Sequence, residues 1–326
     1  MSFSNGDSTG YSRELCRGAL DGWNRFWFSP ADPATFSMIR ILAGLMLFYT
    51  HLVWTIELDA FFGAAPWLSA EALAANIEPS PWSYFWLIES PAMLWTAHIA
   101  ALVVIAMLTI GLFSRVASVL TFVITVSYAL RVPGALFGLD QINALLAMYL
   151  MVGPSGACYS VDRWWARRRG KVDDATRPSI GANIGIRLMQ VHMCVIYLFS
   201  GLGKLQGDTW WDGSAIWGAV ASLEYQSMDL TWMASWPLLV SFLTHITVWW
   251  EVSYCALVWP RLTRPLVILV AIPLHLGIAL GLGMITFGLA MLIGNAAFVS
   301  PALTRKVLDK AAAPLLGQTK GTGVIY

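Results

Sequence analysis

Charged side chains are scarce in this sequence of 326 residues. Only 12% of its residues are Asp, Glu, Lys or Arg, whereas soluble domains carry about 25%. Hydrophobic residues make up 57%, and the mean hydropathy is +0.63. The formal net charge of +1 offers no basic surface, so we expect no nucleic-acid partner. This composition is typical of a polytopic membrane protein.

Motifs for disulfides, metals and nucleotides are also missing. The four cysteines show no CxxC or Cys/His spacing, so we expect buried thiols and neither a disulfide framework nor a metal site. No nucleotide-binding glycine motif occurs. The polar N-terminus has no continuous apolar run, so we expect no cleaved signal peptide. Tryptophan, in contrast, is abundant at 17 residues, and it favours membrane interfaces.

Apolar runs dominate the sequence. A membrane-spanning helix needs about 20 mostly apolar residues. Windows of that length predict an all-α, polytopic transmembrane bundle of about eight spans. The predicted spans are 36–57, 92–113, 116–131, 135–154, 184–204, 236–258, 264–283 and 284–300.

The positions of Lys and Arg predict the orientation, because basic loops stay cytoplasmic. Basic residues are absent between Arg40 and Arg115 and from Leu205 to Pro260, so the two long connections there are predicted to be structured outside loops. Arginine clusters in 162–177, and more basic residues follow position 304. The chain is therefore expected in the inner membrane with both termini cytoplasmic.

This orientation divides the chain into three parts. We expect a cytoplasmic or interfacial segment at 1–33, the transmembrane domain at 34–302 and a cytoplasmic tail at 303–326. Membrane lipid is an expected partner of the domain.

One lysine ends an otherwise apolar predicted span. Lys204 closes 184–204, at an end that the orientation places outside. A charge in or beside a bilayer is costly and indicates a functional site, with snorkelling to the headgroups as the alternative. At about 100° per residue, Gln190, Tyr197 and Lys204 share one helical face, which Ser200 joins. This face predicts a polar site inside the bundle.

Other polar side chains of the spans and loops are candidates for the same site, although their spacing does not say which of them meet. A lone histidine or amide is more often a packing hydrogen bond, and a Trp-rich loop is more often an interfacial belt. An arginine at the end of a span also has a snorkelling alternative. The residues expected to bind substrate are Arg40, His51, Asn143, Arg187, Gln190, Tyr197, Trp210, Trp211, His245 and Glu251.

Several segments together resemble a known family. SGLGKLQGDTWWDGSAIW at 200–217, preceded by RLMQVHMCVIYLF at 187–199, resembles the signature helix and loop of the HTTM family, the membrane domain shared with vitamin K-dependent gamma-carboxylase. Similar elements are DPATFSMIRILAGLMLFYTHL, YSVDRWW and LHLGIALGLGMITFGLAMLIGNAAF. These segments follow one another in the family's order over nearly the whole chain.

The resemblance implies a lysine base. In the carboxylase, a lysine in a GxxKL context deprotonates vitamin K hydroquinone. The hydroquinone then reacts with oxygen to give an epoxide and a strong base, which removes a glutamate γ proton before carbon dioxide adds. Lys204 matches that lysine in GLGKL, and His275 matches a histidine of the late helix pair. The resemblance therefore implies that both are catalytic, with His245 and Glu251 matching a histidine and a following acidic residue.

Two differences from the carboxylase shape the expected reaction. Its Asn-His pair is replaced here by GLDQINALLAMYL, which includes Asn143 but no histidine. The carboxylase also has a large lumenal domain after its helices, whereas this sequence ends at Tyr326. We therefore expect oxygen-dependent epoxidation of reduced vitamin K or another quinol, a lipophilic small molecule. Coupling of the epoxidation to carboxylation stays open as the less favoured reaction, and the sequence does not identify a protein substrate. No metal is expected.

Two other functions remain open. The chain is alternatively a non-catalytic lipid-binding, quinone-binding or transport protein, in which Lys204 pairs with Asp208, Asp212 or an anionic headgroup. It is alternatively a membrane factor for the maturation or export of a partner protein.

Overall fold

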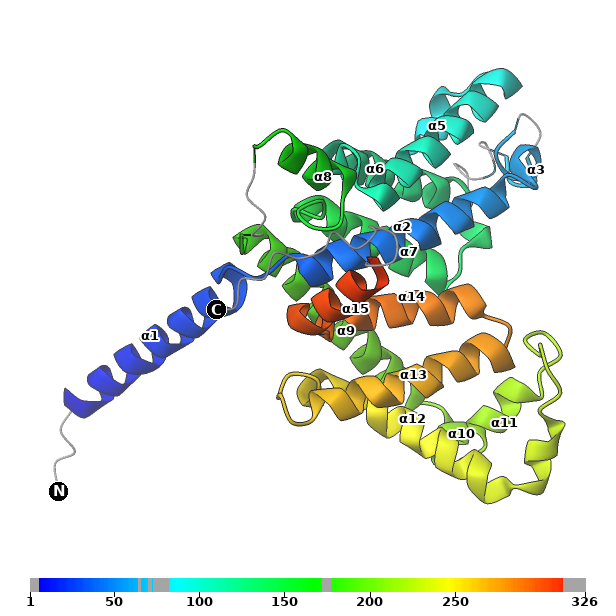
Figure 1. Ribbon diagram of the computed structural model, residues 1–326. Helices are drawn as coiled ribbons and strands as arrows, with labels where there is room; N and C mark the ends of the chain where they lie inside the picture. Colours follow the sequence, from blue (N-terminus) through cyan, green and yellow to red (C-terminus); the bar gives the residue numbers. More distant parts are fainter. Residues whose placement is uncertain (1–5, 64–65, 70–71, 73–81, 172–176, 313–326) are drawn as a thin grey trace, which may run out of the picture.

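The structure is a computed structural model that describes residues 6–63, 66–69, 72, 82–171 and 177–312. Within these ranges the chain is helical and has no β-strand, apart from an isolated antiparallel bridge between Ala31 and Ser179 (Figure 1). The helices are α1 (Gly6–Phe28), α2 (Ala34–Trp54), α3 (Leu58–Phe62), η1 (Tyr84–Leu87), α5 (Pro91–Ile110), α6 (Ser114–Arg131), η2 (Pro133–Ala135), α7 (Gly138–Val152), α8 (Val161–Arg168), α9 (Ile180–Lys204), α10 (Asp208–Trp211), α11 (Ala215–Val220), η3 (Thr231–Ser235), α12 (Pro237–Leu257), α13 (Arg264–Gly281), α14 (Ile285–Asn295), η4 (Ala296–Phe298) and α15 (Pro301–Ala312).

Each of the eight predicted spans is a helix in the structure: α2, α5, α6, α7, α9, α12, α13 and α14. In the part of the chain that is described, α2, α5, α9 and α13 are long and apolar enough to cross a membrane. A fifth span results if α14 and α15, which meet at a bend of 120°, count as one. The helical class is therefore confirmed and the helices suit a membrane-embedded protein, while the count of eight stays a prediction.

The long helices form two groups (Figure 1). One group contains α2, α5, α6 and α7, and the other contains α9, α12, α13 and α14. They meet where α7 and α2 pack against α9 and α14. The larger hydrophobic core draws its residues from both groups, chiefly from α2, α7, α9, α12, α13 and α14, while a second core lies largely within the first group. The predicted polar face of α9 therefore points into the larger core.

Glycine brings helices close together at two positions. A Cβ on Gly44 would lie 2.9 Å from the Cα of Thr109, so α2 and α5 touch at this level. A Cβ on Gly201 would lie 3.0 Å from the backbone nitrogen of Val252, so α9 and α12 also touch. Side chains cannot fit between backbones this close. The Gly201 contact brings the end of α9 against the middle of α12.

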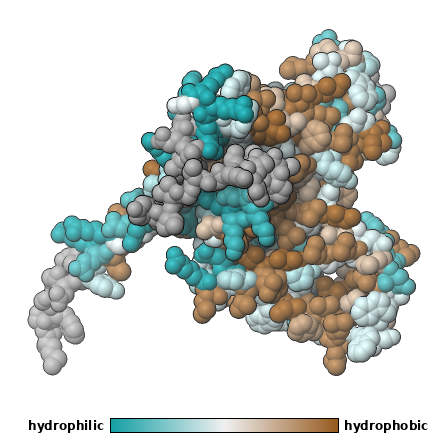
Figure 2. Space-filling view, in the orientation of Figure 1, coloured by the Kyte–Doolittle hydropathy of each residue, from teal (hydrophilic) through white to brown (hydrophobic). Residues whose placement is uncertain are grey.

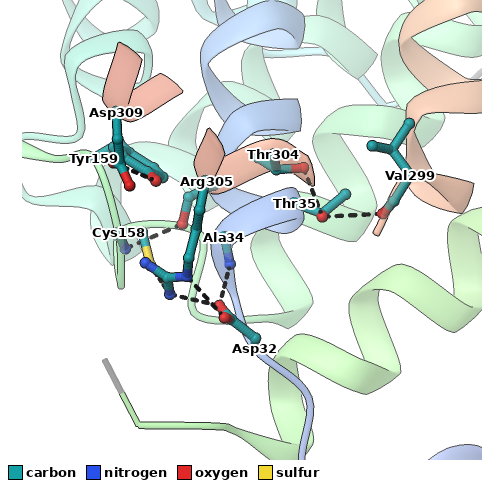
Figure 3. Close-up of polar contacts among 10 residues, drawn as sticks. Asp32, Ala34, Thr35, Cys158, Tyr159, Val299, Thr304, Arg305 and Asp309 are labelled. Carbon is teal, nitrogen blue, oxygen red and sulfur yellow. Dashed lines mark hydrogen bonds and ion pairs between the residues drawn. The ribbon is translucent and has the colours of Figure 1, made fainter. Parts of the chain in front are cut away.

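A set of polar contacts ties α15 to the start of α2 (Figure 3). Arg305 donates two hydrogen bonds to the carboxylate of Asp32, at 2.7 and 2.9 Å. Tyr159 donates to Asp309 at 3.0 Å. Burial by itself would raise the pKa of Asp32, but the bonds from Arg305 and the Ala34 N–H outweigh it and lower this pKa. Residues 303–312, predicted as part of a tail, thus belong to a helix fixed on the bundle.

The surface of the bundle divides into an apolar region and a hydrophilic end (Figure 2). Hydrophobic side chains cover the outer faces of the long helices, with Val103 of α5 and Leu269 of α13 both more than half exposed. The hydrophilic surface gathers at the end of the bundle that carries α1, α8 and α15 (Figures 1 and 2). An apolar belt with a polar end is the surface expected for helices in a bilayer.

Candidate functional site

The lysine at the end of α9 turns into the bundle and meets a carboxylate of α12. Lys204 Nζ lies 2.8 and 3.0 Å from the two carboxylate oxygens of Glu251, and it donates to Ser200 Oγ at 2.7 Å. The side chain of Lys204 is 22% exposed and that of Glu251 is 7% exposed. The ring centroid of Trp210 lies 5.3 Å from the ammonium, within cation–π range. Together these four groups form the Lys204 site.

The partner of Lys204 is not the one that proximity in sequence suggests. Asp208 and Asp212 were the expected carboxylates in the non-catalytic alternative. Asp212 instead accepts hydrogen bonds from the backbone and the hydroxyl of Ser214, which lower its pKa. Lys204 pairs instead with Glu251, 47 residues away, because α9 and α12 pack side by side at Gly201.

The Lys204 site lies well inside the length of α12. α9 and α12 are antiparallel, because Tyr197 packs against Tyr254 while the later residue Lys204 meets the earlier residue Glu251. Glu251 follows Pro237 by 14 residues, which is about 21 Å along a helix. The end of α9 therefore lies about 21 Å, measured along α12, from the first residue of α12. The connection from 205 to 236 spans this distance.

The connection after α9 folds over the site. Trp211 Nε1 donates to the carbonyl of Leu205 at 2.8 Å, which turns the chain back on the end of α9. His245 of α12 contacts two carbonyls, that of Ser241 at 2.8 Å from Nδ1 and that of Trp211 at 3.2 Å from Nε2. A carbonyl only accepts, so a proton on either ring nitrogen gives His245 a bond to one of these two carbonyls. His245 thus holds the Trp-rich connection against α12.

Two turns before Lys204, α9 enters a buried hydrogen-bond network. Tyr197 Oη lies 2.6 Å from His275 Nε2 of α13 and accepts from Asn295 Nδ2 of α14 at 2.7 Å. Tyr254 of α12 donates to Asn295 Oδ1 at 2.7 Å. Asn295 Nδ2 also donates to the carbonyl of Met291, which fixes the amide orientation. We call these four side chains the tyrosine network.

The proton positions in the tyrosine network follow from its partners. Tyr197 accepts from Asn295, so its own hydroxyl proton is free to go to His275 Nε2. That leaves His275 protonated on Nδ1, an atom that has no hydrogen-bond partner among the described residues. The bond to Tyr197 is where His275 contacts α9. Tyr197 precedes Lys204 by seven residues, which is about 10 Å along the helix.

The other residues predicted to bind substrate lie in two further places. At the polar end, Arg40 is fully buried and donates to the carbonyls of Ser155 and Tyr159. Arg187 donates to Gln190 at 2.9 Å, 17 residues before Lys204, or about 25 Å away along α9.

In the first helix group, His51 of α2 and Asn143 of α7 are buried and line a small cavity with Tyr128 of α6. His51 Nε2 and Asn143 Oδ1 have no hydrogen-bond partner among the described residues. The structure thus brings together Lys204, Glu251 and the Trp-rich connection, and it places Tyr197 and His275 two helical turns from the lysine. Arg40, Arg187, Gln190, His51 and Asn143 lie apart from them.

Two aromatic residues of the site were not singled out from the sequence. Tyr254 closes the tyrosine network, and Trp250 packs edge-on against Tyr197 with the ring centroids 4.7 Å apart. Tyr254 follows Glu251 by three residues, which places both on one face of α12. That spacing is the signal that identifies Tyr254 once Glu251 is taken as a site residue.

A larger cavity lies away from the lysine. A groove of about 650 Å³ between α2 and α14 is lined almost entirely by apolar side chains, including Leu45, Leu289 and Ile293. Lys204 and Glu251 do not line it. Asn295, on the same helix as Leu289 and Ile293, bonds instead to Tyr197 of α9.

Comparisons with known proteins bring no assignment: no family model, no curated protein and no solved structure matches the chain. The HTTM resemblance thus stays a prediction. In the described ranges, no three His, Cys, Asp or Glu side chains are grouped so as to hold a metal ion. The chemistry of the Lys204 site therefore has to be inferred from its own residues.

Proposed function

We propose that the chain is a membrane-embedded enzyme that deprotonates a lipophilic hydroquinone, with Lys204 as the base and Glu251 as the group that shares its proton. The supporting observation is the paired ammonium and carboxylate, 2.8 Å apart and largely removed from solvent, at the end of an apolar helix. The resemblance of GLGKL to the lysine motif of the carboxylase supports the same role.

The pairing with Glu251 gives Lys204 a way to act as a base. Burial disfavours two separate charges, so in apolar surroundings the neutral amine and carboxylic acid come closer in free energy to the ion pair than they do in water. In the neutral pair, Glu251 holds the proton and the Lys204 amine has a free lone pair. A hydroquinone O–H bond then breaks as an N–H bond forms, which leaves a hydroquinone anion beside an ammonium.

Molecular oxygen completes the reaction as the oxidant. The hydroquinone is oxidised to the quinone epoxide, one oxygen atom enters the epoxide ring, and the other leaves as water with the two hydroxyl protons. The tyrosine network positions α9, α12 and α14 around the lysine. His275, bonded to Tyr197, is a positioning residue on this proposal unless the substrate extends to its Nδ1 atom.

A binding or transport protein is the second candidate, and one observation favours it. α9 stops at the level of Glu251, and short helices α10 and α11 continue the chain beside α12. Interrupted helices within the membrane are typical of transporter binding sites. On this proposal the pair switches partners with an ionic ligand and no bond is broken.

The finer placement in the membrane belongs to the same proposal. We infer an inner-membrane protein with eight spans, both termini cytoplasmic and the Trp-rich connection outside. The distribution of arginine supports it, because the polar end of the bundle carries the basic helix α8.

Purified protein distinguishes the two candidates. We expect co-purifying quinone by mass spectrometry and oxygen-dependent epoxide formation from reduced quinones, lost in Lys204→Ala and retained in Asp208→Asn, a matched acidic neighbour outside the pair. A folded wild type that binds no quinone and forms no epoxide from any reduced quinone contradicts the enzyme. Uptake of a labelled anion into proteoliposomes that depends on Lys204 favours the transporter instead.

A further inference from the structure

Two arginines from different helices meet at Trp259, in the loop between α12 and α13. The guanidinium carbon of Arg187, on α9, lies 4.4 Å from the ring centroid of Phe26 and 5.9 Å from that of Trp259. Arg264, the first residue of α13, donates to the carbonyls of Val258 and Trp259, at 3.0 and 2.6 Å. The two guanidinium groups are close enough to repel each other. We call Arg187 and Arg264 the arginine pair.

The arginine pair has no acidic partner in the part of the chain that the structure describes. The described salt bridges join other residues. The sequence has no Asp or Glu between Glu251 and Asp309, the stretch that carries Arg264. Asp32, which follows the end of α1, is bonded to Arg305 instead. Two like charges held together without a counter-charge repel, and an anion placed between them turns that repulsion into attraction.

The contacts that fix the arginine pair leave some of its donors unused. Arg187 Nη1 donates to Gln190, and Arg264 uses Nε and Nη2 for the two carbonyls. Arg187 Nη2 and Arg264 Nη1 form no hydrogen bond among the described residues, and both side chains are only partly buried. The N–H groups of a guanidinium lie in one plane that matches the oxygens of a phosphate. The arginine pair therefore offers charge-assisted donors from two helices.

The arginine pair lies at the end of the bundle from which α1 leaves. Asn183 of α9 binds the carbonyls of Phe26 and Trp27 there, and Phe26 packs on Trp259 with the ring centroids 5.6 Å apart (Figure 1). Tryptophan favours the level of the lipid headgroups. An exposed apolar strip on α13 begins two residues after Arg264, with Leu266 and Leu269 both more than 60% exposed. Headgroup donors and a surface for an acyl chain thus adjoin each other.

We propose that the arginine pair binds the phosphate of an anionic phospholipid, whose acyl chain lies along the apolar strip of α13. Basic sites between membrane helices recognise lipid phosphates in this way. A soluble phosphate would use the same donors but not the apolar strip. A zwitterionic lipid also has a phosphate, but its ammonium group opposes the charge of the pair. The inference does not depend on the chemistry at Lys204.

Lipid binding to the full-length protein tests this site. The protein is delipidated in detergent, supplied with phosphatidylglycerol or phosphatidylcholine, and analysed by native mass spectrometry, which counts the lipids that remain bound. The variants are Arg187→Gln and Arg264→Gln. Arg261→Gln is the matched control, because Arg261 is an exposed arginine of the same loop that bonds to neither partner of the pair. A competition with inorganic phosphate at constant ionic strength separates a lipid from a free anion.

We expect the wild type to retain one phosphatidylglycerol more tightly than phosphatidylcholine. Each glutamine variant of the pair should lower the affinity for phosphatidylglycerol about fivefold, whereas Arg261→Gln should leave it within about twofold. Circular dichroism checks the fold, and where a glutamine variant unfolds, Arg187→Lys or Arg264→Lys replaces it. These keep the charge and lose the planar donors, so they should weaken binding less.

Three results would overturn the proposal. Equal affinity of the wild type for the two lipids would show that the pair does not select an anion. An equal loss in Arg261→Gln would show that only the general charge of the loop matters. Displacement of phosphatidylglycerol by inorganic phosphate would show that the ligand is a soluble anion and that the apolar strip takes no part.

Discussion

The Lys204–Glu251 pair allows a quantitative test by a double-variant cycle. Removing one partner of a buried pair leaves an uncompensated charge, which costs about 3–5 kcal/mol. Lys204 keeps 22% exposure and a second partner in Ser200. We therefore expect Glu251→Met to lower the free energy of unfolding by about 3 kcal/mol, at the low end of that range.

Lys204→Met should cost a similar amount, because Glu251 is then a carboxylate with 7% exposure and no cation. The double variant replaces both charges with apolar chains of similar length and should lie within about 1 kcal/mol of the wild type. Unfolding by SDS in mixed micelles, followed by circular dichroism, measures all four proteins. Asp208→Asn is the control and should leave stability unchanged.

An additive cycle would refute the pairing. If the double variant loses the sum of the two single losses, Lys204 and Glu251 do not stabilise each other and the 2.8 Å contact has no energetic role. Single variants that each lose less than about 0.5 kcal/mol would mean that the pair behaves as an exposed salt bridge. Either result would also remove the basis for a proton shared between the two groups.

Three other predictions concern different parts of the fold. Tyr197→Phe leaves His275 Nε2 without its donor and should cost about 1–3 kcal/mol in the same unfolding assay; an unchanged protein would contradict the network. Gly44→Leu forces α2 and α5 apart and should cost about 1–3 kcal/mol or more, measured as a lower melting temperature, with no loss contradicting the close contact. The lowered pKa of Asp32 means that its bond to Arg305 stabilises the protein above the unfolded pKa of about 3.9 and that this contribution is lost as pH falls through the folded pKa. Arg305→Met should therefore be less stable than the wild type at neutral pH, with the difference disappearing in acid; a difference that grows in acid would reverse the assignment.

The sequence predicts the long apolar helices well, because a long apolar run within a bilayer has to satisfy its own backbone hydrogen bonds, and a helix does so. The segment predicted at 264–283 is α13 at 264–281, and the one predicted at 36–57 is α2 at 34–54. Arg40, Gly44 and His51 lie on one buried face of α2, as their spacing along a helix requires. Helical periodicity fixes which side chains share a face before any tertiary contact is known.

The composition of the site was less predictable. Periodicity places Tyr197 and Lys204 on one face of α9, but it cannot choose Glu251 over nearer acidic residues, since that choice depends on how α12 packs. The separation of His51 from the Lys204 site has the same origin, because the division of the helices into two groups is a tertiary property. The short helices α8, α10 and α11 lack an apolar run long enough to reveal them.

The way α9 ends bears on how a ligand arrives. Its last carbonyls are satisfied by the connection itself: Gly207 N–H donates to Lys204 O at 3.0 Å, and the indole of Trp211 donates to Leu205 O. Lifting the connection would strand both carbonyls at about 2 kcal/mol each, so that roughly one molecule in a thousand would be open. If the ligand is the lipophilic hydroquinone proposed above, a path sideways from the bilayer avoids this cost. The concentration that governs saturation is then the mole fraction of ligand in the lipid, and diluting the vesicles with water at a constant lipid-to-ligand ratio should leave the rate unchanged.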